Sequence, residues 1–298
     1  MPRVVDLFPT GGPVDPELMI GRAGELEDLV GALGEGISVA LVGPRRIGKT
    51  TLGAAACAAL EDQMTVLPRI EVPDKRQDCS ELLGLVIARY FTRSSSDELA
   101  EARGVLGKFF RGTLKDHAGL ELPEAEGGEQ EALTSRQALE LLAALADETR
   151  RPVLVFFDEL QRVADAADYR AFLGDIVDVF AGGAKVVVLA DGSDDRLQYL
   201  LDDPDLRLDK LLPIMAPGWT IARAEWRDEL LDRFAELKLP ISPQDLEQIL
   251  DLGAGAPFPT MVACQEVAMA ARQLQGTEVD QPALTYGLAA ARDRMKDA

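Results

Sequence analysis

The clearest chemical pattern in this sequence is GPRRIGKT at positions 43–50, which satisfies the spacing G-x-x-x-x-G-K-[ST]. Glycines let such a loop curl so that its backbone N–H groups face one point, and the helix that follows adds partial positive charge. Lys49 would then reach the β- and γ-phosphates of a nucleotide, and Thr50 would bind Mg²⁺. The pattern predicts that a nucleotide contacts the residues of this phosphate loop, namely Gly43, Arg45, Arg46, Ile47, Gly48, Lys49, Thr50 and Thr51.

Two alternatives remain open for these residues. The whole segment is also compatible with a glycine-containing turn between a strand and a helix that holds a lysine without binding phosphate. The two arginines at the tip, Arg45 and Arg46, are equally compatible with contact to a partner or to solvent. The apolar run before the loop and the small-residue run after it favour phosphate binding.

A second chemical pattern closes the apolar run at 152–160, where two acids stand together about a hundred residues after the phosphate loop. Asp158 would hold Mg²⁺ through water, and Glu159 would polarise the attacking water as a catalytic base. An ordinary acidic strand end is the alternative. Ser193, after the apolar run at 185–193, is a third candidate that would orient the water or touch the γ-phosphate. Asp191 competes for that role, and a simple turn residue in "DGSDD" is as compatible with the pattern.

The elements that must position these groups alternate along the chain. Strands are expected at 37–42, 64–72, 152–160, 185–193 and 211–217, and Pro68 would place the second of them at a sheet edge or bulge. Helices are expected at 21–33, 49–61, 79–92, 97–111, 135–149 and 169–181, with a solvated acidic loop at 121–131. Alternation of strand and helix predicts an α/β fold with a parallel sheet and helices on both faces.

The pattern changes near residue 221, after which only helices are expected. We therefore predict an irregular N-terminal arm at 1–19, a nucleotide-binding core at 20–221 and a small helical domain at 222–298. Ser242, Pro243 and Asp245 form a helix start, with a capping serine, a proline in the first turn and an acid three residues on.

Composition narrows the class of protein. The 298 residues carry 31 basic and 51 acidic side chains, for a net charge of −20, which repels both nucleic-acid backbones and membrane headgroups. DNA is therefore not expected as the main ligand. No apolar run reaches the length of about 20 residues that spans a bilayer, and the N-terminus lacks a signal-peptide pattern. Three cysteines without metal-type spacing suggest free thiols in a reducing cytoplasm.

Several segments, taken in order, resemble the STAND and archaeal-type P-loop ATPases of the broad AAA+ and origin-recognition-like group. They are "MIGRAGELEDL", the loop "GPRRIGKTTL", the acidic strand "VLVFFDELQ", the fourth strand "VVVLADGS" and the segment "LGAGAPF", which spread from residue 20 to about residue 260. Each is similar to a family motif at the same place in the order. The sequence departs from the family pattern at Ile20, where an aromatic is common, and at Asp191, which adds an acid near the phosphates.

The resemblance implies a fold and further site residues. The strands, numbered along the chain, would take the order 5-1-4-3-2, and the helical domain would form a lid that closes over ATP. Gly21 and Arg22 would lie near the nucleotide, and Pro257 would pack near the adenine. Arg207 would complete a neighbouring molecule's site by acting on the γ-phosphate, with Arg196 as its rival. The alternative for Arg207 is surface pairing with Asp203, Asp205 and Asp209.

These observations favour a Mg²⁺-dependent ATPase that acts as a molecular switch and passes its nucleotide state to a partner protein or to its own assembly. ATP is favoured over GTP because no guanine-specific Asn-Lys-x-Asp motif occurs. One alternative is a DNA-associated AAA+ ATPase of the replication or transposition type. Another is a nucleotide sensor that binds but does not hydrolyse.

Overall fold

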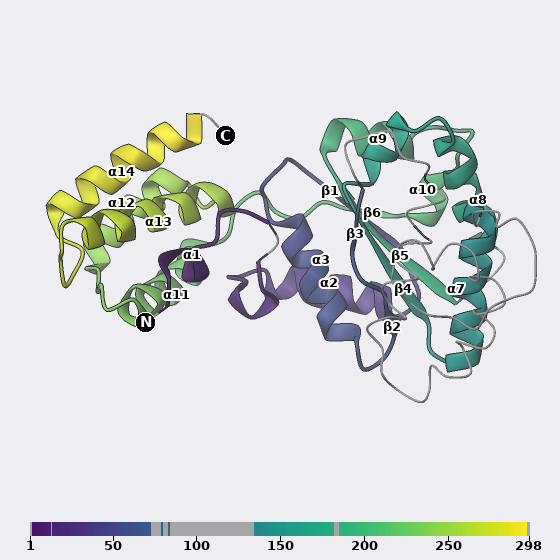
Figure 1. Cartoon of the computed structure of the whole chain (residues 1–298), viewed down its shortest axis with the longest axis horizontal. Coiled ribbons are helices and arrows are strands. Elements are labelled where there is room, and N and C mark those ends of the chain that lie inside the picture. The colour runs from purple at the N-terminus through teal and green to yellow at the C-terminus, as the bar shows by residue number, and fades with distance from the viewer. Residues whose placement is uncertain are drawn as a thin grey trace, which may run out of the picture. The chain divides into compact units, whose positions relative to one another are not determined.

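The computed structural model describes residues 2–12, 14–72, 79, 83, 134–181 and 185–296, and its central feature is a parallel sheet (Figure 1). The sheet order is β2-β4-β5-β1-β6, and β3 also pairs with β4. All pairs are parallel, and the order is the one that the family resemblance implies, so the predicted fold is confirmed. The strands are β1 (Val39–Val42), β2 (Thr65–Val66), β3 (Ile70–Glu71), β4 (Val153–Asp158), β5 (Val186–Gly192) and β6 (Ile214–Met215).

The two central strands explain why the sequence shows continuous apolar runs. Every residue of β4 and β5 is buried, as expected for parallel strands that are covered on both faces. Alternate side chains of the two strands, on one face of the sheet, join those of α7 (Ser135–Thr149) and α8 (Tyr169–Ala181) in one apolar core. The two helices pack against each other, and α7 also contacts both strands. Thr134 caps α7 by accepting a hydrogen bond from the backbone N–H of Gln137.

The edge of the sheet beside β4 is interrupted, as the proline there predicts. β2 and β3 both pair with β4, and Pro68 lies between them. Val66 is opposite Leu154 and Ile70 is opposite Phe157, so the edge segment has one more residue than β4 between these pairs. Proline has no N–H to give to the ladder, and an extra residue forms a bulge at such a position.

The remaining helices of the α/β part each precede or follow a strand along the chain. They are α2 (Ala23–Gly34), α3 (Lys49–Leu60), the 3-10 helix η2 (Leu160–Asp165), α9 (Asp194–Leu201) and α10 (Leu208–Leu211). The helices predicted at 79–92 and 97–111 and the loop predicted at 121–131 lie outside the described residues, apart from positions 79 and 83.

The C-terminal part is helical, as predicted. It contains α11 (Arg223–Glu236), α12 (Pro243–Gly253), α13 (Pro257–Gln273) and α14 (Gln281–Lys296), which share a second apolar core. Ser242 caps α12 by accepting the N–H of Asp245, and Pro243 follows it as the first helical residue. A close approach between α13 and α14 requires Gly287, because a Cβ there would lie 2.6 Å from the backbone nitrogen of Val267.

The N-terminal segment is more ordered than the irregular arm expected from its Pro and Gly content. It forms a short helix α1 (Val4–Leu7) and a 3-10 turn η1 (Pro16–Leu18), and Phe8 is buried in the C-terminal helical core. The guanidinium of Arg233 in α11 donates to the carbonyl oxygens of Leu7 at 2.8 Å and Leu18 at 2.6 Å. Long-range hydrogen bonds therefore order a segment whose local sequence favours a loop.

The chain divides into two compact units. One contains Met1–Leu26, Gly43–Ala55 and Pro217–Ala298, and the other contains Glu27–Val42 and Ala56–Ala216. The phosphate loop therefore belongs to the same unit as the C-terminal helices, and the sheet belongs to the other. No helix in the described part of the chain is long and apolar enough to cross a membrane.

Candidate functional site

The phosphate loop begins at Gly43, directly after β1, and ends where α3 begins at Lys49. The Lys49 ammonium donates to the carbonyl oxygens of Gly43 and Pro44, both at 2.8 Å, so the loop curls around the lysine. Gly48 has φ 91° and Arg46 has φ 67°, a backbone region that favours glycine. The described geometry thus places an ammonium at the start of a helix, inside a loop of backbone groups.

The tip of the loop contacts the helical part of the same unit. The Arg46 guanidinium lies 4.2 Å from the centroid of the Phe258 ring, a cation–π contact. Phe258 follows Pro257, which is the first residue of α13. Arg45 and Arg46 are both exposed, and Ile47 is buried. The structure therefore brings Arg46 and Pro257 into one region, while contact of any of these residues with adenine or phosphate stays a prediction.

Arg22 joins the phosphate loop to the segment that precedes the C-terminal helices. It is 8% exposed, and its guanidinium donates to the carbonyl oxygens of Ile47 and Gly218, both at 2.7 Å. It also pairs with Glu25 at 3.2 Å. Burial lowers the pKa of Arg22, although the nearby Glu25 carboxylate opposes that shift. Gly21 has φ 65°, and a Cβ there would lie 2.6 Å from Ile221 Cγ2.

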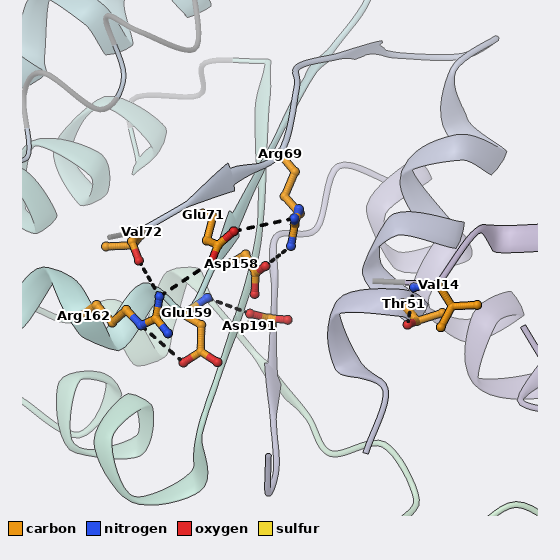
Figure 2. Close-up of polar contacts among 9 residues, drawn as sticks. All are labelled: Val14, Thr51, Arg69, Glu71, Val72, Asp158, Glu159, Arg162 and Asp191. Atoms are coloured by element: carbon orange, nitrogen blue, oxygen red, sulfur yellow. Dashed lines mark hydrogen bonds and ion pairs between the residues drawn. The ribbon is translucent and has the colours of Figure 1, made fainter. Parts of the chain in front are cut away.

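The N-terminal segment also reaches the phosphate loop helix. The backbone N–H of Val14 donates to the Thr51 hydroxyl at 3.3 Å, as Figure 2 shows. Thr50 and Thr51 both lie in the first turn of α3 and are half-buried. Sequence reasoning did not anticipate this contact, because no motif links positions 14 and 51.

The two predicted acids lie at the carboxyl end of β4, in the unit that holds the sheet (Figure 2). Asp158 is the last residue of the strand and is buried, and its carboxylate forms an ion pair with Arg69. Arg69 lies 3.8 Å from Glu71 as well. The structure thus shows a cation beside the acid that is expected to hold Mg²⁺, and nothing in the sequence pattern of 64–72 indicated it.

Glu159 follows with a left-handed backbone, φ 60° and ψ 43°. Its N–H donates to Asp191 Oδ1 at 2.8 Å, and its carboxylate accepts a hydrogen bond from Gln161 Nε2. Arg162 Nε lies 3.9 Å from the same carboxylate and Arg162 Nη1 donates to the carbonyl of Val72 at 2.9 Å. Sequence reasoning missed Gln161 and Arg162 as neighbours of Glu159; the only signal was the glutamine in the segment "VLVFFDELQ".

The two remaining candidates lie elsewhere in the sheet-containing unit. Ser193 is the residue before α9 and is half-buried, and its side chain makes no capping hydrogen bond. Arg207 precedes α10, is exposed and has φ 55°. Among the described residues Arg207 makes no ion pair, and Asp203 and Asp205 pair with Arg170 instead, at 2.7 Å and 3.8 Å. The pairing of Arg207 with those two acids is therefore not observed. The catalytic roles of Ser193 and Arg207 stay predictions.

Comparisons with known proteins show the family of this chain and structures with a similar fold. A family model described as an AAA ATPase domain matches residues 19–189, which is more than half of the chain. A Walker-type ATPase from Pyrococcus abyssi is similar in structure, with a TM-score of 0.63 and 18% identity over 98% of this chain and 77% of that one. No curated protein sequence matches the chain.

Two solved structures from Aeropyrum pernix are also similar. The ORC2 protein, in its ADPNP–ADP complexes, has a TM-score of 0.60 and 18% identity over 96% of this chain and 71% of that one. The ORC1 protein in complex with DNA has a TM-score of 0.57 and 15% identity over 98% of this chain and 69% of that one. At these identities the likeness shows the fold alone.

Proposed function

Because this chain belongs to the AAA ATPase domain family, we propose that it binds ATP with Mg²⁺ and hydrolyses it. One observation carries this proposal. The strands β1, β5 and β4 are neighbours and parallel, so their carboxyl ends meet at one edge of the sheet. The phosphate loop follows the first of them in the chain, Asp191 lies near the end of the second, and Asp158 ends the third. Ligands of open α/β sheets bind at this edge.

Each group has a task in such a reaction. The Lys49 ammonium, which now bonds two loop carbonyls, would turn to the β- and γ-phosphates. Thr50 and Asp158 offer a hydroxyl and a carboxylate, the oxygen donors that Mg²⁺ prefers. A bound Mg²⁺ neutralises charge on the β- and γ-phosphates. Glu159 would accept the proton of the attacking water, and Arg69 would give up its ion pair with Asp158 when nucleotide is bound.

We further propose that the protein acts as a switch, which transmits its nucleotide state to another molecule. Its support is two contacts of the phosphate loop within its own unit. Arg46 lies on the Phe258 ring of α13, and Arg22 bonds both Ile47 of the loop and Gly218, in the segment before the C-terminal helices. A movement of the loop would be transmitted to these contacts, as in a hinge-type transition. The receiver would be a partner protein or a second copy of this chain.

The test uses three variants of the full chain. Lys49→Ala should remove most of the affinity for a fluorescent ATP analogue, while Lys210→Ala, which removes an exposed lysine, should not. Glu159→Gln should bind ATP as the wild type does but release no phosphate, because an amide cannot accept the proton. Equal ATP affinity of Lys49→Ala and wild type would end the phosphate-loop assignment. ATP hydrolysis by Glu159→Gln at the wild-type rate would remove Glu159 from the mechanism, and a wild type that binds without hydrolysis would be a sensor.

DNA remains the second candidate ligand, because one similar structure is an ORC1 protein in complex with DNA. The net charge of −20 opposes it, since each phosphate contact needs a Lys or Arg and steepens the salt dependence. We expect weak binding of a fluorescent duplex at physiological salt. Tight binding that persists when salt is raised would favour a DNA-associated ATPase.

A further inference from the structure

We propose that Asp191 and Gln161 are positioning residues for Glu159. Asp191 holds the backbone N–H of Glu159, and Gln161 holds its carboxylate. Gly192 has a part in the same arrangement, because it leaves the space that Gln161 fills. The catalytic meaning of this inference rests on the proposed function, in which Glu159 is the base. The contacts themselves are properties of the nucleotide-free chain and can be tested without ATP.

The first contact fixes the backbone of Glu159. A left-handed conformation is unfavourable for a residue with a Cβ, so it persists only where neighbouring groups hold it. Here the N–H of Glu159 donates to Asp191 Oδ1 at 2.8 Å. Asp191 is 1% exposed and belongs to β5, which is paired on both sides, by β1 and β4. The acceptor therefore belongs to a central strand of the sheet.

The second contact fixes the side chain. Gln161, on η2, is 3% exposed, and its Nε2 donates to Glu159 Oε2. An ionised carboxylate can only accept hydrogen bonds, so the amide must present its nitrogen to Glu159 and its oxygen to the opposite side. That oxygen is buried and has no hydrogen-bond partner among the described residues. The structure thus leaves one end of the amide unsatisfied while the other end holds Glu159.

Gly192 explains how this amide is accommodated. A Cβ at position 192 would overlap Gln161 Oε1 and would lie 2.9 Å from Leu197 Cβ, closer than such atoms approach in proteins. Any larger residue must therefore displace Gln161, Leu197 or the end of β5. The glycine that follows Asp191 is required by the packing of Gln161.

This arrangement assigns Asp191 a role different from the one that its place in the sequence suggests. By its place in the sequence it competes with Ser193 for contact with the γ-phosphate or the attacking water. In the structure an oxygen of its carboxylate accepts the Glu159 N–H instead. Without this hydrogen bond the Glu159 carboxylate should occupy a wider range of positions. Because small misplacements of a reacting group strongly reduce the rate of a reaction, kcat should fall. Nucleotide affinity, which depends on the phosphate loop, should not change.

The variants Asp191→Asn and Asp191→Ala distinguish a positioning role of Asp191 from a role of its negative charge. Asparagine keeps the oxygen that accepts the Glu159 N–H, whereas alanine removes it. In the nucleotide-free full chain, we expect amide hydrogen exchange at Glu159 to stay slow in Asp191→Asn and to quicken at least tenfold in Asp191→Ala. We expect kcat to remain within about threefold of wild type for Asn and to fall about 100-fold or more for Ala, each with unchanged ATP affinity. Equal losses of kcat in both variants, or unchanged exchange in Asp191→Ala, would overturn the proposal.

Gln161→Met and Gly192→Ala test the second contact. Each should lower kcat without weakening ATP binding, and the double variant should lose no more than the worse single variant, because both act on one contact. Losses that multiply would show that the two residues act independently and would refute the link. If Gly192→Ala does not fold, as judged by circular dichroism, Gln161→Met decides alone, and an unchanged kcat there counts against the proposal. A wild type without ATPase activity would refute the proposed function, while amide exchange at Glu159 would still decide whether Asp191 holds it.

Discussion

Replacement of Arg22 by methionine tests how the phosphate loop is attached to the rest of its unit. Methionine keeps much of the apolar stem but removes the guanidinium, which donates to the carbonyls of Ile47 and Gly218 at 2.7 Å each. Arg22 is buried, so water does not readily replace these bonds. A hydrogen bond from a charged donor contributes about 1.5–3 kcal/mol. The variant no longer bears the cost of burying a guanidinium, which offsets part of the stability lost with the two hydrogen bonds. We therefore expect a net loss of about 3 kcal/mol in the unfolding free energy.

Chemical denaturation followed by tryptophan fluorescence measures this loss. Both tryptophans, Trp219 and Trp226, lie in the unit that contains Arg22, and Trp226 is buried in its core. A loss of about 3 kcal/mol lowers the folding equilibrium constant about 160-fold. Affinity for a fluorescent ATP analogue should fall as well, because Ile47 belongs to the phosphate loop.

The matched control is Arg223→Met. Arg223 forms ion pairs with Glu247 and Asp251, but it is exposed, and exposed pairs contribute little. We expect a much smaller change in the unfolding free energy and none in ATP affinity. If the two variants lose the same stability, burial does not decide the contribution of Arg22 and the reasoning is wrong. If Arg22→Met unfolds more easily but binds ATP as the wild type does, Arg22 does not shape the phosphate loop.

Three further outcomes are expected. If Arg207 acts on a neighbouring molecule, ATPase activity per molecule should rise with protein concentration, and Arg207→Ala should flatten that rise; constant activity on dilution would sink this idea. Gly287→Ala should lower the unfolding free energy by about 1–3 kcal/mol because its Cβ would meet the backbone of Val267, whereas Gly174→Ala, which has open space, should not destabilise. Burial raises the pKa of the Cys57 thiol to about 12. The folded thiol thus keeps its proton above the unfolded pKa of about 8.5, so stability should fall between pH 8.5 and 12, and less so in Cys57→Ala; equal pH slopes in urea denaturation would contradict this.

Local sequence determined most of the fold and the position of the loop between β1 and α3. Apolar runs that end at Gly43 and at Asp158 predict buried parallel strands, because only strands covered on both faces need such runs. Pro68 predicted an edge position, since it has no N–H for a ladder, and the structure places it at a bulge on the edge. The segment at 135–149 forms a helix with the predicted bounds, because its apolar spacing and its capping threonine act within a few residues. These features depend on residues that are close together in the chain, so they can be predicted from the sequence.

Tertiary structure alone decided which side chains surround the predicted acids. Arg69 and Asp158 are 89 positions apart, and their ion pair exists because β3 and β4 lie side by side. Asp191 meets the Glu159 backbone because β5 pairs with β4, and Gln161 fits because Gly192 has no side chain. The N-terminal arm was expected to be irregular, yet Phe8 is buried among helices of the distant C-terminal part. Such contacts result from long-range packing, in which the free energy of burial outweighs local conformational preference, and no pattern of neighbouring residues encodes them.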